Sequence, residues 1–429
     1  MTRQNIEVPE LARVEGEGGL FIGLKDGTVA EIRLDIYEPP RFFEGFLRGR
    51  YLQEVPDITA RICGICPVAY QMSAVYALER ALGVTVSPSV RALRRLLYCG
   101  EYIESHALHI YMLQAPDLLG HESALSLAVV APEVVKKALR LKKIGNALLR
   151  TIGGRSVHPV SSCVGGFYKW PDAAAMKALL PDLEWGLQAA LETARWSVTL
   201  PYPELEIDYE FVANHLPDEY AIIEGEVLSS KRGAMPVEQF DQVYIEQHVQ
   251  HSNALHSLTV DGQPYLVGPL ARLNLNHEQL GPSAKGVLEE IKVDLPIRNP
   301  YKALIARAIE LVQAYEDAIN LVKSYQPEGP SAAKLMLRAG EGCAATEAPR
   351  GLLFHRYTLD AAGLVQSARI VPPTAQNLAR IEEDLRQMAP KVLDMPHDQA
   401  TLTCEHLVRS YDPCISCATH FLKLDIKEL

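Results

Sequence analysis

The sequence lacks any uninterrupted apolar run of the roughly 18 residues that a membrane-spanning helix requires. It also lacks an excess of positive charge, because 42 Lys and Arg residues stand against 53 Asp and Glu residues, giving a formal net charge of −11. Proteins that bind nucleic acids neutralise phosphates with clustered Lys and Arg, so this balance argues against that class. Residues 1–9 are polar and acidic, and no secretory signal is visible in them.

Two further absences restrict the redox chemistry that the chain can perform alone. No Gly-x-Gly-x-x-Gly follows a predicted strand, so a dinucleotide-binding motif is not indicated. Beyond two close pairs described below, no group of cysteines could carry a series of iron–sulfur clusters. The remaining cysteines are scattered singly and are interpreted as small buried hydrophobic residues: Cys99, Cys163, Cys343 and Cys404.

The spacing of apolar and polar residues predicts the secondary structure. Alternation over residues 19–37 predicts a β-hairpin. Helical periodicity predicts helices over 87–113, 132–151, 172–198 (disturbed at Pro181), 300–325 and 374–393. Residues 201–276 contain strand-like runs, and Asp261-Gly262 predicts a further hairpin turn.

We therefore predict an α+β fold that is mainly α, a bundle of long packed helices with an N-terminal β-hairpin and a mixed β region. The chain of 429 residues is expected to form a single interlocked domain. Its four expected parts are an N-terminal β region with the first cysteine pair (1–86), helices (87–200), a mixed α/β region (201–296), and helices with the second cysteine pair (297–429).

Two Cys-x-x-Cys pairs stand near opposite ends of the chain, Cys63 with Cys66 and Cys414 with Cys417. A two-residue spacer lets both sulfurs of a pair approach one ion. Four thiolates need a cation, and such soft ligands select zinc, iron–sulfur clusters, copper, or nickel and iron. We therefore predict a metal site that closes where the two chain ends meet.

A structural zinc ion is the first alternative for these pairs. Zinc ribbons, however, hold their pairs roughly 15–20 residues apart, whereas nearly the whole chain separates these. Arg61, Asp412 and His420 flank the pairs and are interpreted as groups that orient the ligands. A thioredoxin-type dithiol would need only one pair, so a catalytic metal site is favoured.

The chain resembles the large, catalytic subunit of nickel–iron hydrogenases. Arg-Ile-Cys-Gly-Ile-Cys at 61–66 and Asp-Pro-Cys-Ile-Ser-Cys-Ala-Thr-His at 412–420 are similar to that family's paired signature. Further segments resemble family landmarks in their expected order, at 13–16, 41–45, 348–351 and 372–377. The sequence of residues 61–67 is most similar to that of the cytoplasmic, multi-subunit branch of the family, which is linked to pyridine nucleotides. A cytoplasmic location is therefore expected.

The resemblance implies that all four cysteines bind nickel and that Cys66 and Cys417 also bridge to an iron carrying carbon monoxide and two cyanides. Cys63 and Cys414 would bind nickel alone. Dihydrogen would be split heterolytically and reversibly, with the Cys414 thiolate as the first proton acceptor. Glu15 matches the family's proton-relay glutamate.

Other matching positions imply supporting roles. Arg350 matches the arginine that overhangs the open metal position, and Asp412 would hold it in place. Thr374 stands where the family usually has a serine that donates a hydrogen bond to a cyanide. Glu44 and His420 match ligands of a second, structural ion, magnesium or iron.

Three departures from the family pattern concern details of the chemistry. Tyr70 replaces a familiar histidine and cannot be a cation near neutral pH. Ser105 replaces an aspartate before His106, so Arg350 loses one acidic neighbour. After His420, many relatives are cleaved, whereas residues 421–429 remain here and alternate like a short strand. The chain is either an uncut precursor or a version that needs no cleavage.

The resemblance also implies partners, because this chain has no electron carrier of its own. We expect an iron–sulfur small subunit over the cysteine site, with flavin- and NAD(P)-binding subunits beyond it and dihydrogen and protons as substrates. The alternatives are a quinone-reducing subunit of respiratory complex I, which shares the fold but lacks the cysteines, a membrane-linked relative that evolves hydrogen, and a structural-zinc or hydrogen-sensing protein.

Overall fold

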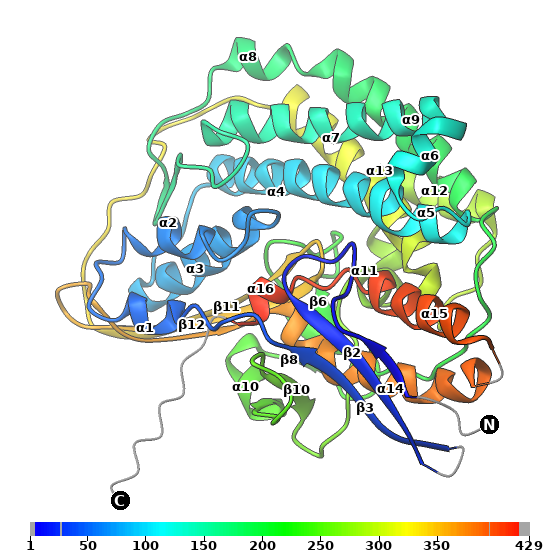
Figure 1. Ribbon diagram of the computed structural model, residues 1–429. Coiled ribbons are helices and arrows are strands. Elements are labelled where there is room, and N and C mark those ends of the chain that lie inside the picture. The colour runs from blue at the N-terminus through cyan, green and yellow to red at the C-terminus, as the bar shows by residue number, and fades with distance from the viewer. Residues whose placement is uncertain (1–4, 26–27, 394, 420–429) are drawn as a thin grey trace, which may run out of the picture.

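The computed structural model describes residues 5–25, 28–393 and 395–419. Figure 1 shows long helices stacked on one side of the molecule and small antiparallel sheets with the C-terminal helices on the other. The fold class is as predicted, α+β and mainly helical. Within the described ranges, no helix is both long enough and apolar enough to cross a membrane.

The helical layer is built from four long helices: α4 (Pro88–Leu108), α7 (Pro132–Gly153), α9 (Leu180–Ser197) and α13 (Ala303–Lys323). Helix α4 begins where Ser87 accepts a hydrogen bond from the Val90 amide, which is the predicted N-cap. Helices α4 and α7 cross closely, because a Cβ added at Gly145 would lie only 2.7 Å from the carbonyl oxygen of Gly100. Glycine at this crossing lets the two backbones approach each other.

Two predicted helices are interrupted, which corrects the expectations for 87–113 and 172–198. After Leu108 the chain continues as a wider π turn, His109–Gln114, and a short α5, Ala115–Leu118. The second range forms α8, Ala173–Lys177, and then α9. Pro181 lies in the first turn of α9, where its missing amide hydrogen breaks no helical hydrogen bond.

The predicted N-terminal hairpin is confirmed. Strands β2 (Gly18–Lys25) and β3 (Thr28–Ile36) pair antiparallel, and β1 (Ile6–Val8) adds a third strand that was not predicted. Asp26 and Gly27, at the predicted turn, lie outside the described residues. Helix α14 (Pro373–Val392), predicted at 374–393, covers this sheet beside β3 (Figure 1).

The mixed region contains two small sheets. One joins β6 (Val212–His215), β7 (Glu226–Ser229) and β8 (Gly233–Met235), and the other joins β9 (Tyr244–Gln247) and β10 (His256–Thr259). The turn predicted at Asp261-Gly262 exists, since the Gly262 amide donates to the Thr259 carbonyl at 2.8 Å. It does not join a hairpin, however, because β10 pairs with the preceding strand β9 across the segment 248–255.

The central layer was missed by the periodicity argument. Strands β11 (Gly340–Ala348), β12 (Gly351–Leu359) and β13 (Val365–Val371) form a sheet that packs against α3 (Pro67–Leu82). Nearly every position of α3 is buried, so no polar face marks it as a helix in the sequence. The structure does not test the proposed division into four parts, which stays a prediction.

The remaining helices and strands are short or peripheral. They are α1 (Phe43–Leu47), α2 (Val55–Ala60), α6 (Ala124–Val130), α10 (Phe240–Val243), α11 (Pro269–Asn276), α12 (Pro282–Ile291), α15 (His397–Ser410), α16 (Ile415–Ala418), β4 (Ser162–Cys163) and β5 (Gly166–Phe167), with 3₁₀ turns at Val237–Gln239, His277–Gln279 and Pro300–Lys302. Figure 1 shows α16 at the centre of the molecule, beside the N-terminal segment.

The contact between α9 and α13 depends on the absence of a side chain at Gly186. A Cβ added there would lie 2.1 Å from the Tyr315 ring, so Gly186→Ala should lower the free energy of unfolding by about 1–3 kcal/mol. Gly286→Ala on α12 is the control, because nothing lies within 4 Å of its added Cβ and alanine favours the helix by about 0.5–1 kcal/mol. Urea unfolding measures both, and equal effects would contradict the packing argument.

Candidate metal centre

The two cysteine pairs meet at one buried point, as the sequence predicts. The Sγ atoms of Cys63, Cys66, Cys414 and Cys417 all lie within 4.8 Å of one another, and each residue is at most 2% exposed. The sulfurs of Cys63 and Cys414, from the two pairs, are 3.5 Å apart. Four thiols converging in this way form a donor set for a soft metal ion or a small metal cluster.

The first pair is held at the start of α3. Cys66 is the N-cap residue of this helix, followed by Pro67, and the Cys63 sulfur accepts the backbone amides of Ile65 and Cys66 at 3.3 and 3.2 Å. The buried Glu101 of α4 accepts two further amides of the first turn of α3, from Val68 at 2.7 Å and from Ala69 at 3.2 Å. These hydrogen bonds fix the turn, and the helix N-terminus favours negative charge on its sulfurs.

The second pair is held by pairing between the two chain ends. The Ile415 amide donates to the Glu15 carbonyl at 2.8 Å, and Glu15 and Cys414 form a short parallel bridge. Asp412, just before the pair, has φ of 56°, a left-handed conformation that aspartate adopts more readily than most residues. The turn at Asp412 directs the chain into the site.

Glu15 has a direct contact with the cysteines. The Cys414 thiol donates to its Oε2 atom at 3.0 Å, and the Ser416 amide donates to the same oxygen at 3.1 Å. Glu15 is half-buried, whereas Cys414 is fully buried. A carboxylate at this boundary can take a proton from a buried sulfur and release it toward solvent.

Arg350 lies in the tight turn between β11 and β12. Its Nε donates to the Asp412 carbonyl and one Nη to the Asp412 carboxylate, both at 2.8 Å. Burial alone would lower the pKa of Arg350, but the charges of Asp412 and then of Cys414 and Cys66 raise it well above its usual value. Arg350 is therefore a permanent cation beside the sulfurs.

Two hydrogen-bond donors at the site remain uncommitted. Nη1 of Arg350 is buried and has no hydrogen-bond partner among the described residues. Thr374, in the first turn of α14, uses its Oγ1 to accept the Cys414 amide at 2.9 Å, which leaves its hydroxyl hydrogen to donate elsewhere. A ligand with acceptor atoms would satisfy both groups.

Burial and neighbouring thiols determine the protonation of the other groups in the site. Burial, then Cys417 and Cys63, raise the pKa of Cys414 well above the usual thiol value. Burial and the charges of the cysteines also raise the pKa of Tyr70, whose buried hydroxyl has no hydrogen-bond partner among the described residues. Tyr70 therefore stays neutral, and its hydroxyl can donate a hydrogen bond to a thiolate sulfur. A metal cation is required before all four sulfurs can be thiolates together.

Two arginines that bind the cysteine loops were not recognised in the sequence as site residues. One Nη of Arg41 donates to the Ile62 carbonyl at 2.7 Å and to the Ser416 carbonyl, so it joins the two cysteine pairs. Arg307 donates from α13 to the carbonyls of Ser410 and Tyr411, at 3.0 and 3.3 Å. Apart from the position of Arg41 in the segment 41–45, no sequence pattern indicates these roles. Both arginines bind backbone carbonyls, which every residue has.

Asp117 clamps the two chain ends to α5. It accepts hydrogen bonds from Arg13 near the N-terminus and, at 2.7 Å, from Arg409 near the C-terminus, and His406 lies 3.2 Å away. Burial would raise the pKa of Asp117, but hydrogen bonds from His406 and Arg409 and the charge of Arg409 lower it to about 2. The carboxylate is thus charged and holds both ends near the metal centre.

The other predicted site residues fall into three groups. Glu44 on α1 accepts the Ile370 amide at 2.7 Å, but its expected co-ligand His420 lies outside the described residues, as does the tail 421–429. Ser105 stands where the resemblance expects an aspartate. Its hydroxyl is buried and forms no hydrogen bond with Arg350 or any other described residue. Arg61 lies on the surface and pairs with Asp57 at 3.2 Å, so it does not contact the sulfurs.

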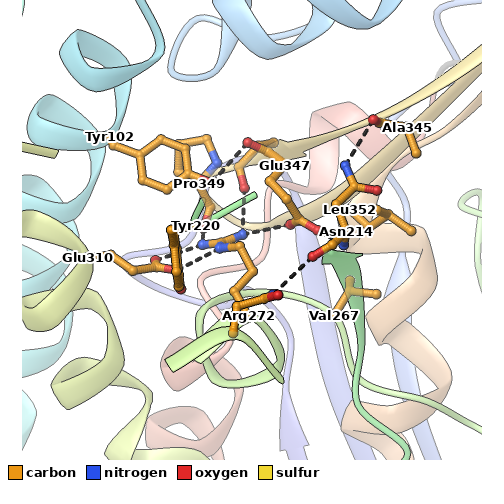
Figure 2. A network of polar contacts seen from close by, with 12 residues as sticks. Tyr102, Asn214, Tyr220, Val267, Arg272, Glu310, Ala345, Glu347, Pro349 and Leu352 are labelled. Carbon is orange, nitrogen blue, oxygen red and sulfur yellow. Dashed lines mark hydrogen bonds and ion pairs between the residues drawn. The ribbon is translucent and has the colours of Figure 1, made fainter. Parts of the chain in front are cut away.

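Arg272 on α11 is the centre of a buried ion network (Figure 2). Its Nε and Nη2 donate to the two oxygens of Glu310 at 2.6 and 2.8 Å, and its Nη1 donates to Glu347 at 3.0 Å. Glu310 also accepts Tyr220 at 2.6 Å and contacts His106 at 2.8 Å. One guanidinium thus compensates two carboxylates that are at most 1% exposed.

The same guanidinium fixes the backbone that carries Arg350. It donates to the carbonyls of Ala348 and Pro349 at 2.9 and 2.8 Å (Figure 2). A Cβ added at Gly268, just before α11, would lie 2.8 Å from the Arg350 carbonyl. The turn is therefore held against α11 on one side, while Asp412 holds the Arg350 side chain on the other.

Comparison with known proteins identifies the family. The family model for nickel-dependent hydrogenases matches residues 41–155 and 227–420. The chain belongs to this family. Its four-cysteine cluster fits the nickel and iron of such an enzyme, and the alternatives of a quinone-reducing complex I subunit and a non-enzymatic zinc protein are set aside.

Individual relatives cover almost the whole hydrogenase subunit. The alpha subunit of sulfhydrogenase 1 from Pyrococcus furiosus is 36% identical over 428 residues, 98% of each chain. The beta subunit of the NAD-reducing hydrogenase HoxS from Cupriavidus necator is 26% identical over 98% of this chain and 95% of its own. A crystal structure of an NAD⁺-reducing [NiFe]-hydrogenase in the H₂-reduced state matches with a TM-score of 0.89 and 26% identity, over 97% of this chain and all of that one.

Within the Arg272 network, the two carboxylates differ in pKa. Burial raises the pKa of both, but Glu310 has two contacts to Arg272 and further donors, so its pKa falls to about 2. Glu347 has one contact to Arg272 and the Asn214 amide, and burial prevails, raising its pKa to about 7. Between pH 4.5 and 7 the folded chain therefore holds a proton on Glu347 that the unfolded chain has lost.

This pKa shift predicts how stability depends on pH. The contribution of Glu347 to the stability of the native state should fall as pH rises from about 4.5 to 7, by about 1.4 kcal/mol per unit. Glu347→Gln removes that dependence. As pH rises from about 4.5 to 7, the free energy of unfolding of the variant should therefore increase relative to that of the wild type, by up to about 3 kcal/mol. Urea unfolding at several pH values measures this difference, and Glu341→Gln, on the solvent side of the same strand, is the control. A difference that stays constant with pH would contradict the shift.

Proposed function

We propose that this hydrogenase chain reversibly oxidises dihydrogen to protons and electrons at a nickel–iron centre held by its four cysteines. The observation that carries this proposal is the convergence of four buried sulfurs within 4.8 Å, with the Glu15 carboxylate 3.0 Å from one of them. A donor set of thiolates only, with an adjacent acid–base group, suits a redox metal centre that exchanges protons.

The site residues have two kinds of role. Some would bind the metals, and others would donate hydrogen bonds to the groups that the iron carries. We propose that Cys63, Cys66, Cys414 and Cys417 would together hold the nickel and the iron. The iron would carry carbon monoxide and two cyanides, and the uncommitted donors of Arg350 and Thr374 support this, because cyanide nitrogen accepts hydrogen bonds. When bound, the metal centre supplies the Lewis acidity that polarises dihydrogen.

The chain's own residues would move the proton. The Cys414 sulfur accepts it first, since metal binding leaves this sulfur a lone pair while lowering its proton affinity. Glu15 then takes the proton across the 3.0 Å contact. Arg350 remains a fixed cation that offsets the anionic site, and Asp412 holds it by two hydrogen bonds.

The electrons would pass to a partner with iron–sulfur clusters and from there to NAD(P) through flavin-containing subunits. In the described residues, Cys63, Cys66, Cys414 and Cys417 form the one metal-binding group that contains cysteine, so this chain offers no second cluster site of its own. NAD-reducing relatives support the acceptor. A cytoplasmic location, and a second magnesium or iron ion bound by Glu44 and His420, stay part of the proposal.

A second candidate differs in the electron acceptor alone. The Pyrococcus furiosus relatives are named sulfhydrogenases, which makes a sulfur compound the acceptor to test against NAD⁺ and NADP⁺. A membrane-linked, hydrogen-evolving relative would instead require membrane subunits in the purified complex. Hydrogen-dependent reduction of each acceptor by the same preparation distinguishes these cases.

Metal content tests the bimetallic centre. The purified complex should contain stoichiometric nickel and the iron of the centre, and its infrared spectrum should show metal-bound carbonyl and cyanide stretches. Cys66→Ser should abolish hydrogen turnover and metal retention together. Cys404→Ser is the matched control, because its hydroxyl can bond to a carbonyl within α15 and should leave both unchanged. Zinc alone at the four cysteines, or an active Cys66→Ser enzyme, would refute the proposal.

The proton relay is tested at Glu15. Glu15→Gln keeps an oxygen for the Ser416 amide but cannot carry a proton, so hydrogen oxidation should fall by about 10²–10⁴-fold with nickel and iron retained. Glu15→Asp should recover part of the rate, and Glu17→Gln, an exposed neighbour, should behave as wild type. Activity above half of the wild-type rate in Glu15→Gln would exclude it from the relay.

A further inference from the structure

A second group of metal-ligand side chains lies where α14 packs beside β3 and β10. Nε2 of His251 lies 2.8 Å from Oε1 of Glu382, and Nδ1 of His256 lies 3.7 Å from Oε2 of the same carboxylate. One ligand atom from each residue lies within 4.8 Å of the other two. None of the roles assigned above uses these residues.

We propose that His251, His256 and Glu382 bind a single divalent transition-metal ion of the zinc type, with water as the fourth ligand. Zinc binds imidazole nitrogen and carboxylate oxygen at about 2.0–2.2 Å, which places neighbouring tetrahedral ligand atoms about 3.3 Å apart. Each histidine lies at a similar separation from one of the two Glu382 oxygens, 2.8 Å from Oε1 for His251 and 3.7 Å from Oε2 for His256. Two imidazoles also favour zinc, nickel or copper over magnesium and calcium.

The exposure of the three residues suits a site that is anchored on one side and open on the other. His256 is 2% exposed, and its Nδ1 atom lies on the side of the ring that faces Glu382. The side chains of His251 and Glu382 are 21% and 16% exposed, which leaves access for an ion and a water molecule.

The carboxylate is already oriented by the backbone. Oε1 of Glu382 accepts the Leu34 amide of β3 at 2.8 Å, and a second lone pair on that oxygen remains for a metal. His251 now contacts the carboxylate through Nε2, and moving its proton to Nδ1 frees Nε2 without net charge change. A ligand held by a second hydrogen bond is typical of metal sites.

The ion would fasten two segments that are distant in the sequence, α14 and the stretch that carries both histidines. Glu382 lies on α14, and His251 and His256 lie around the segment 248–255, whose Asn253 amide donates to the Ile36 carbonyl at the end of β3 at 2.7 Å. Thr374 lies eight residues before Glu382 on the same helix, about 12 Å along its axis, and accepts the Cys414 amide. We infer a structural role, in which the ion stiffens the helix that reaches the cysteine site.

Cobalt substitution tests the site in the intact, matured complex. After treatment with a chelator, Co²⁺ titration of the wild type should yield one equivalent with tetrahedral d–d absorption and no thiolate-to-cobalt charge transfer, which separates it from cobalt at the cysteines. His251→Gln and Glu382→Gln should each weaken this binding at least about tenfold. His248→Gln, three residues from His251 and outside the group, is the matched control and should bind as wild type.

The substitutions preserve local hydrogen bonding, because glutamine at 251 still donates to Glu382 and glutamine at 382 still accepts the Leu34 amide. Unchanged circular dichroism and unchanged nickel and iron contents show that each variant is folded. Two outcomes would contradict the site: a wild type that shows no spectrum of cobalt bound by nitrogen and oxygen, or equal cobalt affinity in the wild type and the three variants. Either would mean that the three residues form only an imidazole–carboxylate hydrogen bond. The readout does not depend on hydrogen turnover, so failure here leaves the proposed function separately testable.

Discussion

Four sulfur atoms that come from both ends of the chain must share one buried point, and most other features of the structure serve this requirement. Cys63 and Cys414 are 351 positions apart, so the site exists only when the N- and C-terminal segments pack together. The parallel bridge between Glu15 and Cys414 makes that contact. Because four adjacent thiolates repel each other in a medium of low polarity, the fold can hold them charged only with a metal cation.

Buried arginines place the loops around the sulfurs. Arg41 joins the two cysteine loops, Arg307 holds the approach to the second pair, and Arg272 fixes the turn that carries Arg350. Each guanidinium has five donors in a rigid plane, so it can bind carbonyls from several segments at once. Desolvation offsets most of the attraction in a buried ion pair. We therefore interpret these arginines as determinants of position, and their contribution to stability as secondary.

The surroundings of each buried carboxyl group explain whether it is protonated or charged. Glu310 and Glu347 face the same guanidinium, yet their pKa values separate because one accepts several charged or polar donors and the other few. Glu15, by contrast, reaches from the half-buried edge of the site to the Cys414 sulfur. Hydrogen-bond number and depth of burial, and not residue type, determine which carboxylate stays charged.

The local sequence predicted those elements that have one apolar and one polar face. The β2–β3 hairpin and helices α4, α7, α13 and α14 were found in this way, because half-buried elements show the period of their geometry. Helix α3 and strands β11 and β12 were missed, because nearly all of their positions are buried. The disturbance predicted at Pro181 corresponds to the start of α9, whereas nothing in the sequence pattern indicated the π turn after α4.

The sequence by itself determined the donor set of the metal centre and, through its order of motifs, the family. Cysteine spacing is a local property, and so is the identity of Glu15, Arg350 and Thr374. Only the tertiary structure decided which further groups meet: that Arg41 joins the two pairs, that Arg272 holds the turn before Arg350, and that His251 and His256 face Glu382. These contacts link residues far apart in the chain, and they form only when burial of the core brings those segments together.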